Sequence, residues 1–489
     1  MTCFGNVRPR VAMIVLLAGV TAAGPLGAQQ ALDRGKIPAP GKPPVLRVPV
    51  WTRATLANGA DLVVSEKHDL PLVSFSITFV GGADQFEKAD KRGVASLAAA
   101  MLSEGTKTRD GEALSNALQL LGGNVSTSVA GESGSIGFVS TAGKFPQTLD
   151  ILVDMLRNST FPDDALMRLK AQRQVALTQA RAQPGSIAAR VFPRVLYGAS
   201  HPFGQTMTEE TLKGITRDDV TAFHQAYFRP GRALISVVGD VQAASIKGVV
   251  EKALAAWPAG GDKPVFTYPA TPAPAATTIY LGDKPGAAQS TFAIGIPGPP
   301  RATPDFYALQ VMNTILGGQF QSRLNANIRE EKGYSYGVSS NFAFGKGPGA
   351  FRAGGDIVSA KSDAALGEFM KELKGIIGAR PITDEELSTA KDALIQRLPA
   401  AFASVASVNG AITTLWLQGL PQDYYQQYPK AVGAITRDDV LRVAKKYVDL
   451  EHLAIVIVGD KATIEAPLKA TGIAPITMLD DYGVPKGTP

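Results

Sequence analysis

Arg329 and Tyr336, two hydrogen-bond donors, stand seven positions apart in the sequence. A guanidinium and a phenol are suited to hold a peptide carbonyl and to stabilise the oxyanion that forms when water attacks it. Gly333 lies between them, so the pattern predicts a helix end carrying Arg329, a turn, and a strand carrying Tyr336. The alternative is that both residues have only a structural role. Arg329 would then pair with Glu330 or Glu331, and Tyr336 would pack in the sheet.

Gly317 and Gly318 follow an apolar run, 307–315, which we expect to be a helix. A glycine-rich loop can cradle phosphate, but this one lacks the Gly-Lys-Ser/Thr ending of a nucleotide-binding loop. Two adjacent glycines can also simply end a helix. The loop therefore has two open interpretations, substrate contact or helix termination.

An Ala- and Leu-rich run over 93–106 predicts a second helix, closed by a Gly-Thr pair. Its middle carries Ser96, Ala99 and Ala100. A hydroxyl and two methyl groups cannot hold zinc, which binds imidazole, thiolate or carboxylate. Ser96 also has no histidine nearby in sequence to activate it, which disfavours a serine hydrolase.

The four histidines are far apart in the chain, and none shares a helical face with another as an H-x-x-E-H motif would require. We expect each of them to have a structural or surface role. They are His68, His201, His224 and His452.

Length and composition predict a globular protein of two or three domains: 489 residues, 45% of them hydrophobic and 19% charged. The formal net charge is +6, with the basic residues scattered, so nucleic-acid binding has little support. The one cysteine, Cys3, lies close to the N-terminus. In the chain that follows it we expect no disulfide and no cysteine metal site.

Residues 1–28 have the pattern of a cleaved signal peptide. Arg8 and Arg10 precede an apolar run over 11–23, and Leu26-Gly27-Ala28 offers a cleavage site. The run of about 13 residues is shorter than the roughly 20 that a membrane span needs. We therefore expect export to a periplasm or beyond, with no stable membrane span, and a Pro-rich arm at 29–47.

An internal repeat organises the rest of the chain. The hexapeptide Ile-Thr-Arg-Asp-Asp-Val occurs at 215–220 and again at 435–440, and Val-Gly-Asp follows at 238–240 and 458–460. In each copy the threonine can cap a helix whose first turn holds two aspartates, and an apolar strand follows. The constant spacing predicts two homologous lobes.

The lobes are predicted at 48–258 and 278–475, with a Pro- and Ala-rich linker at 259–277 and a tail at 476–489. In the first lobe we expect paired strands at 61–67 and 73–79, and a hairpin at 124–130 and 134–141. Helices should begin at 110 or 111 and at 145, and Asp163 should cap a long helix that runs towards Gln183, where Pro184-Gly185 stops it. Alternating hairpins and helices indicate an α+β fold of two two-layer sandwiches.

The run over 93–106 resembles the N-terminal helix of the insulinase, pitrilysin and mitochondrial-processing-peptidase family of zinc peptidases. In that family the frame is G-x-A-H-x-x-E-H-M-L-x-x-G-T, with histidine ligands at the positions of Ser96 and Ala100 and the glutamate base at Ala99. The resemblance extends over about 48–473. It implies two lobes facing each other like a clam shell.

The family's third ligand is a glutamate on a later helix, which should be the one predicted from Asp163, yet 165–208 contains no acidic residue. The resemblance also covers 328–338, where the family's second-lobe Arg and Tyr face the zinc; Arg329 and Tyr336 match them. In the non-catalytic processing subunit of this family, a glycine-rich loop contacts the substrate. That loop corresponds to Gly317 and Gly318 here.

The resemblance implies the non-catalytic subunit of an exported heterodimeric zinc peptidase. A homologous partner with H-x-x-E-H would carry the zinc, and this chain would hold none. Arg329 and Tyr336 would act at the partner's site, with peptide captured by strand addition. The alternative is a peptide-binding or structural scaffold of the same fold with no catalytic partner.

Overall fold

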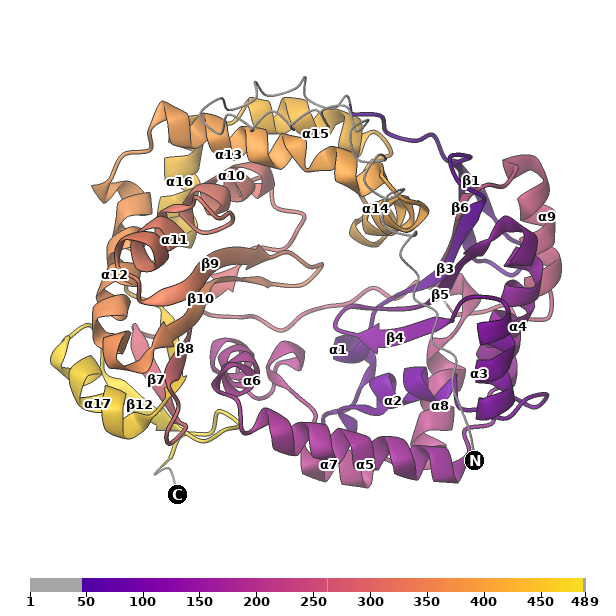
Figure 1. Ribbon diagram of the computed structural model, residues 1–489, viewed down its shortest axis with the longest axis horizontal. Helices are drawn as coiled ribbons and strands as arrows, with labels where there is room; N and C mark the ends of the chain where they lie inside the picture. The colour runs from indigo at the N-terminus through magenta and orange to yellow at the C-terminus, as the bar shows by residue number, and fades with distance from the viewer. Residues whose placement is uncertain (1–45, 262, 487–489) are drawn as a thin grey trace, which may run out of the picture. The chain divides into compact units, whose positions relative to one another are not determined.

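The computed structural model describes residues 46–261 and 263–486. The predicted signal peptide, 1–28, and most of the predicted arm, 29–45, lie outside the described residues. The described part contains two six-stranded mixed sheets, one in each half of the sequence (Figure 1). Each sheet is covered by helices, which confirms the α+β fold of two sandwich lobes.

Sheet one belongs to the first lobe, and its strands are not in sequence order. The predicted pair at 61–67 and 73–79 is wrong as a pair, because the repeat strand β6 lies between them and is parallel to β2. β6 is buried along its whole length, as its unbroken apolar sequence allows. The spatial order is β1 (Thr52–Thr55), β2 (Asp61–Glu66), β6 (Ala233–Gly239), β3 (Leu72–Val80), β5 (Ser133–Thr141), β4 (Ser126–Ala130).

Sheet two repeats this order in the second lobe, as the internal repeat predicts. The matching repeat strand, β11 (Ala454–Gly459), is again central, and it is parallel to β7 (Thr278–Asp283) as β6 is parallel to β2. β12 begins the predicted tail, so the second lobe continues past its predicted boundary at 475. The spatial order is β12 (Ile476–Leu479), β7 (Thr278–Asp283), β11 (Ala454–Gly459), β8 (Gln289–Gly298), β10 (Gly349–Val358), β9 (Ser335–Ala343).

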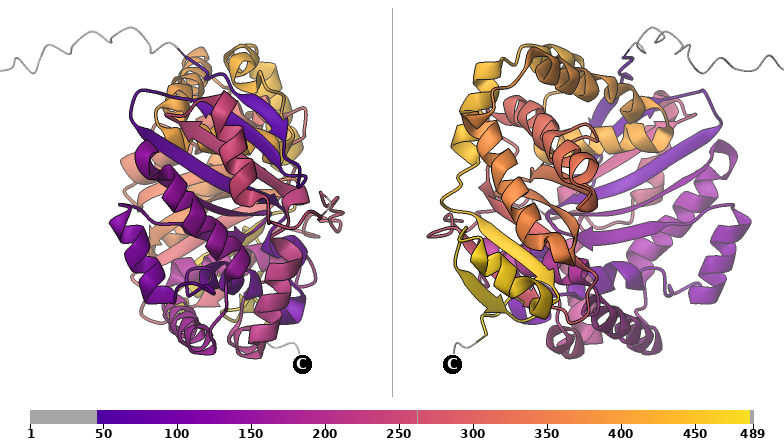
Figure 2. Two further views of the ribbon diagram at one scale, coloured as in Figure 1. Left: turned by 90° about the vertical axis from the view of Figure 1, so that its right-hand side faces the viewer. Right: turned by 60° about the vertical axis from the view of Figure 1, so that its left-hand side comes forward.

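Helices α4 and α9 cover the outer face of sheet one (Figures 1 and 2). Alternation along β3 sends Phe75, Ile77 and Phe79 into that core. The predicted hairpin and the helices starting at 110–111 and 145 are confirmed. The first-lobe helices are α1 (Ala83–Phe86), α2 (Val94–Met101), α3 (Gly111–Leu120), α4 (Phe145–Asn158), α5 (Asp163–Ala180), α6 (Pro184–Tyr197), α7 (Glu209–Gly214), α8 (Arg217–Tyr227) and α9 (Ala243–Leu254).

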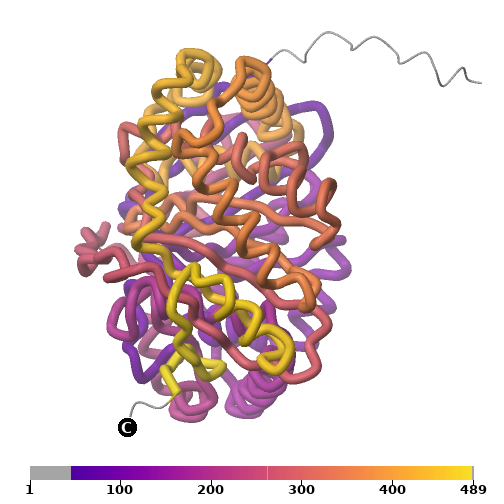
Figure 3. The backbone as a smooth tube through the Cα atoms, turned by 90° about the vertical axis from the view of Figure 1, so that its left-hand side faces the viewer, coloured from indigo at the N-terminus to yellow at the C-terminus, as the bar shows by residue number. Residues whose placement is uncertain are grey.

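Helices α12 and α17 pack on the outer side of sheet two, and α10 contacts its edge strand β9 (Figure 3). The predicted linker, in its described residues, contains neither helix nor strand. The second-lobe helices are α10 (Phe306–Leu316), α11 (Arg323–Asn325), α12 (Ser362–Lys374), α13 (Asp384–Gln396), α14 (Val405–Gln418), α15 (Tyr424–Gly433), α16 (Arg437–Tyr447) and α17 (Lys461–Ala470).

The two lobes exchange a helix. α6 comes from the first half of the chain but packs on β8 and β11 of sheet two, while α14 comes from the second half and packs on β3 and β6 of sheet one (Figure 1). Val191 and Phe192 of α6 are buried with Val456 of β11 in one apolar cluster. On α14 the buried Asn409 amide donates to the carbonyl of Ser236. Separating the lobes would expose both helix faces.

The predicted helix from Asp163 to Gln183 needs correction at both ends. Pro162 is the residue before the first helical position, so Asp163 does not cap the helix. The helix ends at Ala180, and Pro184 begins α6 at the position where a missing N–H is tolerated. The Pro-Gly pair therefore marks the start of the exchanged helix.

The repeat helices α8 and α16 have identical caps. The Thr216 hydroxyl accepts from Asp219 N–H at 3.2 Å, and the Asp219 carboxylate accepts from Thr216 N–H at 2.8 Å. Thr436 and Asp439 form the same pair at 3.1 and 3.0 Å. These are reciprocal capping boxes, as the sequence predicts.

Removing either cap should therefore weaken its helix by a similar amount. We expect Thr216→Ala and Thr436→Ala each to lower the free energy of unfolding by about 1 kcal/mol. Urea unfolding followed by circular dichroism measures this. Thr221→Ala, in the interior of α8, is the matched control and should change stability by less than about 0.5 kcal/mol.

Among the described residues no single helix is long and apolar enough to cross a membrane. One bent pair, 384–402 with 405–418, reaches the required length and composition together, with an angle of 114° between its parts.

Candidate functional site

Arg329 lies near the end of a helical segment in the second lobe, as predicted. Three α-helical residues, 323–325, continue into a π-helical stretch, Ala326–Glu331. Gly333 has a φ of +65°, which a residue without a side chain adopts freely, and β9 begins at Ser335. The helix, turn and strand inferred from the sequence are confirmed. π-helical turns are rare and often occur at functional sites.

A buried ion pair anchors the start of this segment. Arg323 is 5% exposed, and its Nε and Nη2 donate to the two carboxylate oxygens of Glu386 at 2.6 and 2.7 Å. The same guanidinium donates to the carbonyls of Arg380 and Pro381. Asn327, further along, donates to Glu372 at 2.8 Å. The segment that carries Arg329 is therefore fixed to α12 and α13.

Asn325 ties the glycine-rich loop to the edge strand β9. Its buried side chain donates to the carbonyl of Phe320 at 2.8 Å and accepts from Val338 N–H at 3.3 Å. Further along β9, Ser340 N–H donates to the carbonyl of Gly317 at 3.0 Å. The outer edge of β9 is therefore already occupied at 338 and 340.

A cavity of about 400 Å³ brings Arg329, Gly317 and Gly318 together. Main chain forms much of its wall, because five of its residues are glycines. A Cβ on Gly317 would lie 2.3 Å from Ser340 N, and one on Gly318 would lie 2.8 Å from the Asn313 amide. Close packing thus requires both glycines. The other residues around the cavity are Gln319, Phe320, Asn325, Gly337, Val338, Ser339, Gly354 and Gly355.

Arg329 and Tyr336 both reach solvent, but only Arg329 is among the residues that line this cavity. The Arg329 Nε lies 3.0 Å from a Glu330 carboxylate oxygen, and the guanidinium stacks 4.5 Å from the ring centroid of Phe320. The Arg329 side chain is 37% exposed, so this ion pair is weak. Tyr336 is 89% exposed, so the interpretation that it packs in the sheet is wrong. Its hydroxyl is open to a ligand.

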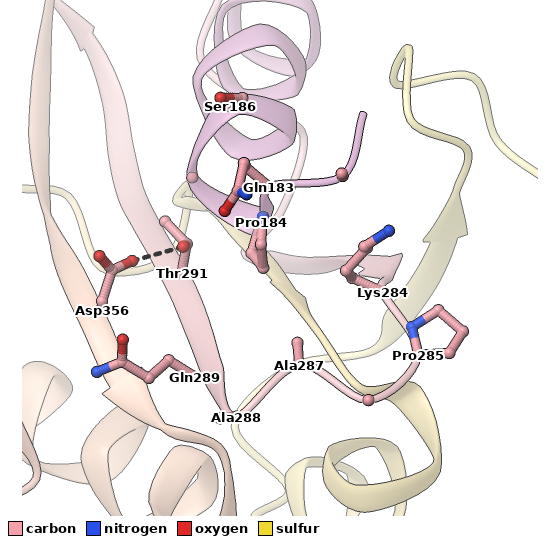
Figure 4. A pocket seen from close by; sticks show the side chains of 13 residues that line it. Gln183, Pro184, Ser186, Lys284, Pro285, Ala287, Ala288, Gln289, Thr291 and Asp356 are labelled. Carbon is pink, nitrogen blue, oxygen red and sulfur yellow. Dashed lines mark hydrogen bonds between the residues drawn. The ribbon is translucent and has the colours of Figure 1, made fainter. Parts of the chain in front are cut away.

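A second cavity, of about 580 Å³, has its own set of lining residues and does not include Arg329 (Figure 4). The first turn of α6 and the loop 284–289 surround it. On one wall the Thr291 hydroxyl donates to Asp356 at 2.6 Å, and Lys284 lies on the other. This cavity therefore has polar side chains on both walls.

Ser96, Ala99 and Ala100 lie in the other lobe, on α2. The Ser96 hydroxyl donates to the carbonyl of Gly93 at 3.0 Å, inside its own helix, and Ala99 is 1% exposed. The Thr127 hydroxyl of β4 donates to the carbonyl of Ala99 at 2.8 Å. These three positions form hydrogen bonds and packing contacts that hold α2 in place. They offer no group for a metal.

The histidines have local partners. His224 bonds to the carbonyl of Leu156, and His201 accepts from Phe203 N–H. His68 lies between Glu66 and Asp240 at the surface, and His452 pairs with Asp449. Over 46–261 and 263–486 no three His, Cys, Asp or Glu side chains are grouped so that they could bind a metal ion.

Two carboxylates and a buried arginine fix the start of α2. Glu87 accepts from the N–H groups of Gly93 and Ala95 at 3.0 and 2.7 Å. Arg92 is 3% exposed and lies 3.5 Å from Glu87 and 3.7 Å from Asp84. Burial raises the pKa of Asp84 to about 6, an effect that Arg92 only partly offsets and Glu132 reinforces.

Asp84→Asn should therefore stabilise the protein in alkaline solution. Because the folded-state pKa of Asp84 is raised above 3.8, the stabilisation from proton binding is present below pH 4 and is lost as the pH rises through about 6. The amide avoids that loss. We expect a gain of about 2 kcal/mol at pH 8 that disappears near pH 4, measured by urea unfolding at both pH values.

The edge strand β4 differs from β9. Among the described residues no strand pairs with its outer side. Alternate N–H and C=O groups of β4 therefore face away from β5, and helices α1 and α2 contact the same strand.

The comparisons with known proteins agree with this geometry. The sequence profile of the insulinase family (peptidase family M16) matches residues 62–196. The profile of the peptidase M16 inactive domain matches residues 214–394. The two matches together span well over half of the chain. The chain belongs to the insulinase family. Within it, this is a non-catalytic member, in agreement with its match to the inactive-domain profile.

Relatives with curated descriptions include both a zinc protease and a non-peptidase homolog. An uncharacterized zinc protease, YmxG of Bacillus subtilis, is 26% identical over 73% of this chain and 85% of its own length. A Helicobacter pylori protein described as a non-peptidase homolog is 24% identical over 82% of this chain and 92% of its own.

Solved structures of the insulinase family have the same fold. The peptidase M16 inactive domain from Pseudomonas fluorescens superimposes with a TM-score of 0.76 at 25% identity, over 84% of this chain and 98% of that one. A protease from Helicobacter pylori gives a TM-score of 0.74 at 19% identity, over 84% and 99%.

Sequence reasoning did not find Asn325 or Phe320, which shape the insulinase-family site here. A single asparagine on a helix carries no pattern that reveals its contact with a strand on the far side of the next turn. In the sequence, the only hint of this contact was Phe320, an aromatic residue two positions after Gly318.

Proposed function

We propose that this chain is the non-catalytic subunit of an exported heterodimeric zinc peptidase. A homologous partner with H-x-x-E-H supplies the zinc and the general base, and this chain completes the peptide-binding chamber. The observation that carries the proposal is an asymmetry between the lobes. In the first lobe the positions that match the family's zinc ligands hold side chains that cannot bind metal, while in the second Arg329 lines a cavity and both Arg329 and Tyr336 reach solvent.

The chemistry proposed for this chain is hydrogen bonding to the reacting carbonyl. The guanidinium of Arg329 and the phenol of Tyr336 donate to the carbonyl oxygen of the scissile peptide bond and to the oxyanion that develops there. The Phe320 ring and the Glu330 carboxylate both contact the guanidinium before substrate arrives, which favours this orientation although each contact is weak. A preorganised donor needs no rearrangement at the moment of reaction.

Strand addition needs an edge strand, and β4 and β9 are edge strands of sheet one and sheet two. β9 is a poor choice, since Gly317 and Asn325 already bond to its outer N–H groups. In the part of the chain that the structure describes, no strand pairs with the outer side of β4. We therefore place strand addition at β4, where main-chain pairing binds extended peptide with little demand on its sequence. Gly317 and Gly318 contribute to substrate binding as a smooth wall of the cavity at Arg329.

The proposed location rests on a part of the sequence that lies outside the described residues. The signal-like stretch 1–28 supports export to the periplasm or beyond. The relative described as a non-peptidase homolog supports a family branch without catalytic zinc.

Co-expression with a neighbouring gene product that bears H-x-x-E-H tests the proposal. We expect the two chains to co-purify, zinc to be present at one per complex, and peptide cleavage to require both. This chain purified alone should hold no zinc and cleave nothing. Stoichiometric zinc and chelator-sensitive cleavage by this chain alone would contradict the proposal, and the lack of any zinc-bearing partner would favour the scaffold alternative.

A further inference from the structure

Two hairpins, one from each sheet, meet tip to tip. The β4–β5 turn of sheet one consists of Gly131 and Glu132, and the β9–β10 turn of sheet two spans 344–348. In Figure 1 the free end of the β9–β10 hairpin points toward the first lobe. The Glu132 carboxylate accepts from Lys346 N–H and from Gly347 N–H, each at 3.0 Å.

The β9–β10 turn is shaped to receive this carboxylate. A Cβ on Gly345 would lie 2.0 Å from a Glu132 oxygen, and one on Gly347 would lie 2.7 Å from the Tyr268 ring. A side chain at either position would displace Glu132 or Tyr268 from its present place. Two successive N–H groups that point into one concave turn form a nest for an anion. Hydrogen bonds from such groups to a carboxylate are short and strong compared with neutral ones.

The linker between the lobes supplies a third donor. Tyr268 donates its phenol hydrogen to Glu132 and accepts from the Gln85 side chain at 3.3 Å. Its ring packs 5.6 Å from that of Phe203. Glu132 therefore joins three parts of the chain: a hairpin of sheet one, a hairpin of sheet two, and the linker.

We infer that Glu132 is a latch that fixes the β4–β5 hairpin against the β9–β10 hairpin. The two hairpins carry elements that the proposed function uses: β4 is an edge strand of sheet one, and β9 carries Tyr336. A strand advances about 3.3 Å per residue, so a displacement of that size shifts a paired peptide by one position. It also turns every side chain to the opposite face.

Glu132 is thus a positioning residue. It sets the distance between the edge that would pair with a peptide and the donors that would meet its carbonyl. The role of Glu132 in aligning a peptide with the donors rests on the proposed function. The latch itself is a property of the isolated chain.

Spin-label distances in the isolated chain test the latch. Ser128→Cys on β4 and Asn341→Cys on β9 place labels at exposed positions of the two hairpins, in a chain whose only other cysteine is removed by Cys3→Ser. Double electron–electron resonance should give one narrow distance distribution. Adding Glu132→Ala should broaden it and shift its mean outward. The matched control Glu112→Ala, on the exposed first turn of α3, should leave it unchanged.

Amide hydrogen exchange supplies a second readout at the donors themselves. We expect exchange at Lys346 and Gly347 to accelerate at least about tenfold in Glu132→Ala, with core amides of β6 and β11 unaffected. If Glu132→Ala fails to fold, Tyr268→Phe removes one donor alone and should produce a smaller broadening. Unchanged distances and exchange in the folded variant overturn the latch. That result leaves the role of Arg329 open, and failure to find a partner leaves the latch standing.

Discussion

Arg329→Ala should lower the kcat of the reconstituted peptidase by about 10²–10³, because a donor to the developing oxyanion acts in the transition state. We expect KM to change little by comparison. Tyr336→Phe, which removes only the hydroxyl, should reduce kcat in the same direction. The double variant should lose less than the product of the two single effects, since both donors meet the same oxygen. Steady-state kinetics with one peptide substrate measures all three.

Lys332→Ala is the matched control for this experiment. It removes one positive charge near the end of the same helical segment, and Lys332 pairs with the exposed Glu331. We expect its kcat to stay within about twofold of the parent complex. Zinc content and co-purification should be equal in every variant. Unchanged turnover in both Arg329→Ala and Tyr336→Phe would show that these side chains have no role at the partner's site.

Glu386→Ala should destabilise the second lobe by about 3–5 kcal/mol. The substitution leaves the buried Arg323 guanidinium with two carbonyl partners and no counter-charge, and breaking a buried pair from one side is strongly unfavourable. It also removes the carboxylate that accepts from Thr383 N–H at the start of α13. Urea unfolding measures the loss, and hydrogen exchange over 323–331 should show where protection falls.

Glu385→Ala is the control, because Glu385 is the exposed neighbour in the same first helical turn. It should cost less than about 1 kcal/mol. The double variant Arg323→Met, Glu386→Leu should recover part of the stability, since it removes the buried arginine charge together with its partly exposed partner and keeps apolar volume. If Glu386→Ala matched Glu385→Ala, the buried pair would not be what anchors the segment that carries Arg329.

Local patterns predicted much of the fold. The repeated hexapeptide identified two homologous lobes, and the structure confirms the repeat down to the hydrogen bonds of each capping box. Thr216 and Thr436 are readable from sequence because a cap depends on residues three positions apart. The helix, turn and strand around Arg329 were predicted for the same reason. Gly333 allows the turn whatever the rest of the chain does.

Strand neighbours and helix partners were not predictable in this way. β2 and β3 are adjacent in sequence, yet β6 enters between them from near the C-terminal end of the first lobe. Pro184-Gly185 resembles the end of one helix and is the start of α6, whose apolar face is buried on the other lobe. An apolar stripe shows that a helix is covered, and it does not show by which sheet.

The sequence by itself determined which chemistry this chain can and cannot contribute. Side-chain type alone removes metal binding at Ser96, Ala99 and Ala100 and keeps two donors at Arg329 and Tyr336. Only the tertiary structure decided how those donors are presented: Asn325 joins loop to strand, Arg323 and Glu386 anchor the segment, and Glu132 spans two hairpins. The type of a side chain determines which bonds it can form, whereas its position and exposure depend on contacts between residues far apart in the chain. Those contacts are settled by which buried surfaces fit together.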